Sequence, residues 1–510
     1  MSFHEAFVWT LLRSVAAAAL AVPLSVVLSR LVQRATGQSR FWWMLLVLCP
    51  LVAPDLIIGY GYRSFELSLL HRPSWNHCFY FVLVVLKFLP AAAVVRICLP
   101  PPPLSKSSLH SARLTGATSK AAQSVQSLKW KTDLLGALPV FGIVFLLTMQ
   151  EFEIASLLQI PAWTVHLFDS QAGGLDSMTV SRHLLLPVIA QAAVLVPLIW
   201  WGLTSFRNSA PGWHFAEDGL RGNMKSGVAI AAAAALLTWG IPLCVISLSG
   251  IAGISGVLRN EILVRSTFLD LTAAIAIAVP CSVLPLILAR KLSCVSRRRE
   301  ASQKRLVRTL RPMLLTLVVV PGLFGSLAVS IVVLSAIQYS PLTDLRATVW
   351  PMSLALILFL APRALVLTVL LPVFRSSESS HLATLLNASP ASSQEKYAAQ
   401  LNWWYECRPL FLVAAVLFYW SLANLTAAAL LCPPTIPLLS FDGNIVPLPV
   451  RLYKFIHQGR TATLSVMALL SVIVPLVLIV FAARVAPRIY MRMSLLARRE
   501  RNQRAFLFRD

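Results

Sequence analysis

Charged residues are scarce in this sequence, and acidic residues are the scarcest. Asp, Glu, Lys and Arg make up 13% of the 510 residues, compared with roughly 25% in an average soluble domain. Hydrophobic residues reach 57%, and 20 acidic residues are opposed by 44 Lys and Arg, for a formal net charge of +24. With a mean hydropathy of +0.74, this composition excludes an ordinary soluble domain and predicts an integral membrane protein.

Motifs for catalysis and cofactor binding are also absent from the sequence. It has no G-x-x-x-x-G-K-[ST] loop to hold a nucleotide, no H-E-x-x-H and no Gly-rich dinucleotide fingerprint. It has no G-x-S-x-G turn to expose a nucleophilic serine. The eight cysteines form no C-x-x-C pair and no zinc-type spacing with histidine. We therefore expect no enzyme activity, no metal site and no cofactor bound by this chain.

Long apolar stretches take up most of the chain. A bilayer core is crossed by about 20 apolar residues, and without barrel-like alternation the spanning segments must be α-helices. Residues 7–32 lack a basic flank and a small-residue cleavage site, so we expect a retained span rather than a signal peptide. Eleven stretches are long enough to span, at residues 7–30, 41–61, 78–100, 136–158, 183–205, 226–249, 266–290, 313–336, 347–373, 409–431 and 462–485.

Lys and Arg gather on one side of these spans. If the N-terminus lies outside, the inside loops and the C-terminal tail hold 32 of the 44 basic residues. Cytoplasmic loops of membrane proteins collect Lys and Arg. We therefore predict an outside N-terminus and a cytoplasmic C-terminus. This distribution explains the positive charge without a nucleic-acid partner.

The order of motifs is repeated along the chain. Thr10-Leu-Leu-Arg-Ser-Val-Ala-Ala matches Thr267-Phe-Leu-Asp-Leu-Thr-Ala-Ala, and each match is followed at the same distance by proline. Leu157-Leu-Gln-Ile-Pro161 likewise parallels Leu430-Leu-Cys-Pro-Pro434. An even number of spans separates the copies, so both halves have the same orientation, as in one known class of transporters.

This repeat predicts two permease-like halves. The first is residues 1–210, with about five transmembrane helices. The second is residues 211–510, with about six helices, an extra leading span at 226–249 and a basic cytoplasmic tail. Whether the first half lacks a matching leading helix stays open.

Two polar stretches interrupt the apolar pattern, one in each half. Each begins with His, which is followed by Ala two residues later and by Gly or Asn six residues later. They resemble the loops through which ABC importer permeases contact their ATPase, whose pattern begins Glu-Ala-Ala; here His stands at the Glu position in both copies. The matching residues are His110, Ala112, Gly116 and Leu128 in the first stretch and His381, Ala383 and Asn387 in the second.

A third stretch, Leu448-Pro-Val-Arg-Leu-Tyr453, precedes the last predicted span. It looks like the same six residues in fused two-half permeases for ferric iron and thiamine. Gln150-Glu-Phe-Glu153 is similar to the Gly-Glu-Phe of that family. The resemblance implies an all-α permease in a bacterial cytoplasmic membrane. It also implies partners: two copies of a cytoplasmic ABC ATPase, which bind the ATP, and an external solute-binding protein.

Ionisable residues in or near the spans are candidate functional residues, because an unpaired charge in lipid is costly. Asp55, Glu151 and Glu153 lie near outer ends of spans. With Arg451 and Tyr453 they are candidates for the external mouth and the substrate path. The alternatives are that both glutamates simply reach water and that Asp55 caps a helix.

Arg13 and Asp270 occupy matching positions in the two halves and carry opposite charges. One interpretation is an ion pair within the membrane. The other is that both side chains reach the outer surface. Lys87 lies in the middle of a span, and the sequence identifies no partner for it.

These observations favour a permease subunit of an ABC importer that moves a small solute inward by alternating access. Ferric iron is the first candidate solute and thiamine the second. One alternative is a permease-derived membrane protein that no longer couples to an ATPase, favoured by the loss of Glu from both loops. Another is an ion-coupled secondary transporter, which would require several acidic residues in mid-membrane.

Overall fold

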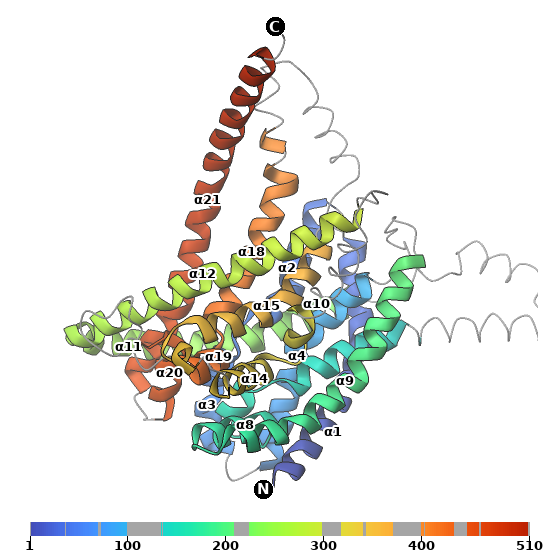
Figure 1. Cartoon of the computed structure of the whole chain (residues 1–510). Coiled ribbons are helices and arrows are strands. Elements are labelled where there is room, and N and C mark those ends of the chain that lie inside the picture. Colours follow the sequence, from blue (N-terminus) through green and yellow to red (C-terminus); the bar gives the residue numbers. More distant parts are fainter. Residues whose placement is uncertain are drawn as a thin grey trace, which may run out of the picture. The chain divides into compact units, whose positions relative to one another are not determined.

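The computed structural model describes residues 2–35, 37–69, 73–98, 134, 136–208, 224–297, 318–339, 343–370, 399–401, 403–432, 446–457 and 461–507. Within these ranges every regular element is a helix, mostly α with short 3-10 and π segments (Figure 1). The all-α prediction is therefore confirmed for the described part of the chain.

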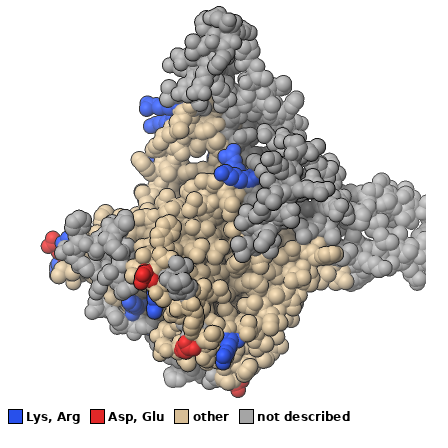
Figure 2. Space-filling model, viewed as in Figure 1, with Lys and Arg blue, Asp and Glu red and all other residues tan. Residues whose placement is uncertain are grey.

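Many of these helices are long and apolar enough to cross a membrane. Among the described residues seven helices meet that requirement, or up to nine if each of two bent helix pairs counts as one span. On the face seen in Figure 2, the Lys, Arg, Asp and Glu side chains drawn in colour form isolated spots on a surface of uncharged residues. Both observations fit a multi-pass membrane protein. The count of eleven spans stays a prediction.

The chain divides into two compact units. The first comprises Met1–Leu248 with Phe324–Thr343, and the second comprises Ser249–Leu323 with Asp344–Asp510. Segments that follow residue 210 thus contribute to the first unit. The halves 1–210 and 211–510 are a different division, based on sequence repeats, and they stay a prediction.

The first unit is built around α1, which packs on α4, α8 and α10, while α9 packs on α8 and α14 and α3 packs on α7. Helices in lipid have no hydrophobic driving force to associate, so they depend on close packing. Small side chains permit this close approach. Ala17, Ala18 and Ala21 of α1 are fully buried, as are Ala92 and Ala93 of α4. The helices of this unit are α1 (Phe3–Arg34), α2 (Gly37–Val52), α3 (Asp55–Leu69), α4 (Pro73–Cys98), the helix Gly136–Met149, α7 (Glu153–Leu157), α8 (Trp163–Ala172), α9 (Ser177–Asn208), α10 (Met224–Ala235), η1 (Leu236–Gly240) and α14 (Ser326–Gln338).

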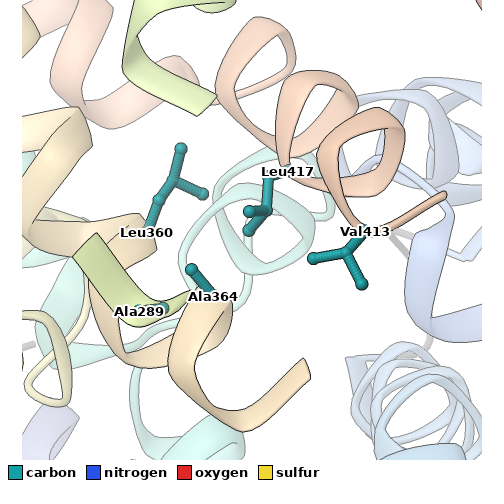
Figure 3. Packing of buried hydrophobic residues seen from close by; sticks show 5 residues of the cluster. All are labelled: Ala289, Leu360, Ala364, Val413 and Leu417. Carbon is teal, nitrogen blue, oxygen red and sulfur yellow. The ribbon is translucent and has the colours of Figure 1, made fainter. Parts of the chain in front are cut away.

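The second unit is built around α12, which packs on α15, α18 and α20. Its apolar core contains Ala289 of α12, Leu360 and Ala364 of α15, and Val413 and Leu417 of α18, which converge in Figure 3. The helices of this unit are α12 (Glu261–Arg297), α15 (Trp350–Leu370), η4 (Trp403–Cys407), α18 (Arg408–Leu422), α19 (Leu425–Leu431), α20 (Leu448–His457) and α21 (Thr461–Leu507); η2 (Thr343–Ala347) and α11 (Ile241–Leu258) cross the unit boundaries.

Two predicted spans are broken helices. The pair Ser39–Val52 and Asp55–Arg63 bends by 72°, and the pair Arg408–Leu422 and Leu425–Leu431 bends by 48°. Pro54 explains the first bend, because proline has no N–H to continue the helix and disfavours helical backbone at the residue before it. These breaks matter because every backbone polar group they release must find a partner inside the protein.

The core of the second unit predicts the effect of a single enlarged side chain. Ala364 is fully buried, so Ala364→Leu should lower the free energy of unfolding by about 1–3 kcal/mol through overpacking. Val366 lies on the same helix with 53% of its side chain exposed, and Val366→Leu should change the unfolding free energy by less than about 0.5 kcal/mol. Unfolding of the full chain in mixed detergent micelles measures both values. Equal effects of the two changes would contradict this packing.

Candidate functional site

The helix Gly136–Met149 ends abruptly inside the first unit. Gln150 forms a turn, the short helix α7 follows, and a second turn around Gln159, whose φ is +51°, leads to α8. Nearly all apolar side chains from Met149 to Phe168 are buried. Non-helical backbone of this kind is tolerated at membrane depth only where protein encloses it or where it lines a cavity.

Glu151 organises this break. Its carboxylate accepts hydrogen bonds from the Tyr80 hydroxyl (2.8 Å), from Ile154 N–H (2.6 Å) and from Ala155 N–H (3.1 Å). The last two N–H groups belong to the first turn of α7, and no earlier helical turn supplies carbonyl groups to accept their hydrogen bonds. Glu151 is only 4% exposed. The carboxylate therefore serves as a buried helix cap rather than reaching water.

Side chains from α8 bind the carbonyl groups that the break releases. The Trp163 indole N–H donates to the carbonyl of Met149 (2.9 Å), and the Thr164 hydroxyl donates to the carbonyl of Glu151 (2.8 Å). The backbone N–H of Trp163 donates to the Thr10 hydroxyl of α1 (3.3 Å). Hydrogen bonds from within the first unit thus satisfy these backbone groups of the break.

Arg13 of α1 also belongs to this site. Its guanidinium donates to the carbonyl of Pro161 and lies 5.3 Å from the centre of the Tyr80 ring. Its charge also interacts with Glu151. Arg13 therefore has partners within the first unit, as a charged side chain in an apolar helix requires.

Lys87 of α4 stabilises the bend between α2 and α3. Its ammonium group forms a salt bridge with Asp55 and donates to the carbonyl of Ala53 at 3.0 Å. The Lys87 side chain is 4% exposed and the Asp55 side chain 32% exposed. Glu151 and Glu153 also act electrostatically on Lys87. The partner that the sequence did not identify is thus Asp55, which is both the first residue of α3 and the anion for Lys87.

The second unit contains a break of the same kind between α18 and α19. The Asn424 side-chain oxygen accepts from Ala427 N–H (2.9 Å) and from the Thr426 hydroxyl (3.1 Å). Asn is among the residues that cap helix N-termini best. A polar side chain therefore caps the short helix in each unit, a carboxylate in one and an amide in the other.

Asp270 of α12 is a buried anion of the second unit. It forms a salt bridge with Arg451 of α20, whose second nitrogen donates to it at 3.1 Å, and it accepts from Val446 N–H (3.1 Å). Its side chain is 1% exposed and that of Arg451 is 19% exposed. The salt bridge links α20 to α12, and the hydrogen bond from Val446 links the segment before α20 to α12.

The predicted site residues thus fall into three groups: those of the first unit, those of the second unit and those outside the described ranges. Arg13, Glu151 and the pair Lys87–Asp55 lie in the first unit, while Asp270 and Arg451 bind each other in the second. Arg13 and Asp270 each have partners in their own unit, and their mutual pairing stays a prediction. Glu153 begins α7 and Tyr453 lies in α20, both half-buried. The predicted loop residues lie outside the described ranges; these are His110, Ala112, Gly116, Leu128, His381, Ala383 and Asn387.

No protein-family model, curated protein or solved structure matches this chain. Its function must therefore be argued from the site itself. Within the described residues no three His, Cys, Asp or Glu side chains lie together as metal ligands would.

Sequence reasoning missed Tyr80, Trp163, Thr164 and Asn424. Asn424 had a readable signal, because Asn followed by a short apolar run is a helix N-cap pattern. The other three act through contacts with residues about 13 to 71 positions away, which no local pattern contains. Chemically, these buried groups bind the backbone groups released at the breaks and keep charges paired.

The Lys87–Asp55 pair predicts unequal effects of its two single changes. Asp55→Leu should lower the free energy of unfolding by about 3–5 kcal/mol, because it leaves a buried ammonium without its anion. Lys87→Met should cost less, because Asp55 is partly exposed and water can solvate it. The double variant should recover most of the loss. Unfolding of the full chain in mixed micelles gives the order, and a larger loss for Lys87→Met would contradict this assignment.

The Asp270–Arg451 pair predicts a similar cycle in the second unit. Arg451→Met should lower the free energy of unfolding by about 3–5 kcal/mol, because Asp270 is then buried without its cation. Asp270→Asn with Arg451→Met should restore most of that stability. Arg346, which is exposed in η2, supplies the control, and Arg346→Met should have little effect. Additive losses in the double variant would show that the two side chains do not depend on each other.

Proposed function

We propose that this chain is the transmembrane permease subunit of an ABC-type importer in a bacterial cytoplasmic membrane, with two permease halves fused in one polypeptide. It moves a small solute inward by alternating access, and a separate ATPase supplies the energy. The chain itself binds no nucleotide.

The observation that carries this proposal is the broken-helix element found in both units. The sequence match of Leu157–Pro161 with Leu430–Pro434 aligns Glu151 with Asn424. Each of these residues caps the short helix that follows a break. Two equivalent breaks support a tandem repeat, and discontinuous helices are where transporter folds commonly build their solute and ion sites.

A second correspondence supports the same reading. The sequence repeat aligns Arg13 of α1 with Asp270 of α12. In addition, Thr164-Val-His-Leu-Phe168 weakly matches the end of Leu448-Pro-Val-Arg-Leu-Tyr453, which aligns His166 of α8 with Arg451 of α20. In both units these two helices pack together, α1 on α8 and α12 on α20. The same contact is therefore made twice by matching parts of the sequence.

The proposed mechanism assigns the two polar stretches to the ATPase. Residues near 105–130 and 378–405 would lie on the cytoplasmic side, and closure of two ATPase copies would push both and rock the two bundles. A solute-binding protein outside would deliver ferric iron, the first candidate, or thiamine, the second. Glu153, Tyr453 and the partly exposed Asp55 remain candidates for the external mouth.

One experiment tests coupling directly. The full chain is purified from its native membrane with its partners, reconstituted in liposomes, and assayed for ATP hydrolysis and for ATP-dependent uptake of radiolabelled ferric iron or thiamine. Gly116→Trp and Ala383→Trp should abolish ATP hydrolysis stimulated by the permease, because bulky side chains block close approach of the partner. Ala301→Trp, in another predicted inside loop, is the control and should retain it.

The outcome also separates the alternatives. Absence of any nucleotide-binding partner in the native complex contradicts the proposal and favours a permease-derived protein without an ATPase. Uptake driven by an ion gradient without ATP favours a secondary transporter. Hydrolysis that both Trp variants leave unchanged contradicts the role assigned to the two polar stretches.

A further inference from the structure

A small cavity lies beside the helix break of the second unit. Its volume is about 20 Å³, and its walls come from α12, α15, α18 and α19 together with Pro447 and Pro449 before and within α20. Most of the lining is apolar, including Ala278 and Met352. The polar side chains on its wall are those of Ser421 and Asn424.

Both polar side chains retain hydrogen-bonding capacity. The Ser421 hydroxyl is buried, with the residue 4% exposed, and it has no hydrogen-bond partner among the described residues. The two bonds of Asn424 use only its side-chain oxygen, so its amide N–H groups remain able to donate. A buried hydroxyl without a partner is destabilising, and native structures place a partner there in most cases.

The matching break in the first unit is closed by protein side chains. There the indole of Trp163 and the hydroxyl of Thr164 donate into the break from the start of α8. The aligned positions at the start of α20 are Leu448 and Pro449, whose side chains have no donor. The start of α8 thus supplies two side-chain hydrogen-bond donors to the break of the first unit, and the aligned start of α20 supplies none.

Cavity size and lining restrict what can bind. One water molecule needs about 10–15 Å³ of such volume and two or more polar partners. The cavity is large enough for one water, and Ser421 and Asn424 provide those partners. No charged side chain lines it, so a neutral molecule is favoured over an ion.

We propose that this cavity binds one ordered water molecule, held by the Ser421 hydroxyl and the Asn424 amide, which takes the place of the Trp163 and Thr164 side chains of the first unit. A water molecule accordingly provides hydrogen bonds at the break of the second unit, whereas protein side chains provide them at the break of the first. This inference does not depend on the identity of the transported solute.

Radiolytic footprinting of the full chain in lipid nanodiscs tests the proposal, because X-ray pulses convert bound water to hydroxyl radicals that oxidise adjacent methionine. Met352 lines the cavity and is 2% exposed, while Met149, at the break of the first unit, is 0% exposed. Met352 should be oxidised faster than Met149. Ser421→Ala and, separately, Ala278→Leu, which fills the cavity, should each reduce Met352 oxidation to the level of Met149.

Two results would overturn the proposal. Equal oxidation of Met352 and Met149 in the unchanged chain would mean that the cavity holds no water and is occupied by lipid or is empty. Faster oxidation of Met352 that persists in both variants would mean that radicals arrive from bulk solvent. Because Ser421→Ala removes a single oxygen atom and adds no bulk, it answers the question even if Ala278→Leu does not fold.

Discussion

Interrupted helices must satisfy their own backbone in a membrane, and much of the buried polar chemistry of this chain meets that requirement. A helix that stops inside lipid exposes N–H and C=O groups, each costing several kcal/mol if unpaired. Lys87 binds the carbonyl of Ala53, Glu151 caps α7, and Asn424 caps α19. The buried charges of Lys87 and Glu151 are therefore tied to particular bends. Removing one of these side chains would leave the backbone groups at its bend without their hydrogen-bond partner and would take an opposite charge away from its neighbours.

The two units meet this requirement by different means. In the first, Glu151 is surrounded by donors from three segments, with Tyr80 reaching it from α4 and its own backbone carbonyl bound by Thr164. In the second, a neutral Asn424 caps the short helix, and the ion pair of the unit lies apart from the cap, between α12 and α20. Matching positions thus carry different chemistry.

The division into units adds a second asymmetry. α10 and α14 both follow residue 210, yet both belong to the first unit, where α10 packs on α1 and α14 packs on α9. Hydrogen bonds of side chains add to this packing. Trp239 of η1, which directly follows α10, donates to the carbonyl of Cys49 in α2 (2.8 Å), and Ser335 of α14 bonds to Ser181 of α9 at 2.9 Å. Helices that follow residue 210 therefore belong to the first unit.

Composition and hydropathy by themselves determined the class of protein, which in its described part is all-α and rich in membrane-length helices. These features are local or additive, so a linear reading contains them. The sequence also marked Glu151, Asp55, Lys87 and Asp270 as costly ions. Only the tertiary structure decided their partners. Asp55 and Lys87 are 32 positions apart, and Asp270 and Arg451 are 181 positions apart. Pairing at such separations depends on which helix faces meet, and helix packing, rather than any local pattern, decides that.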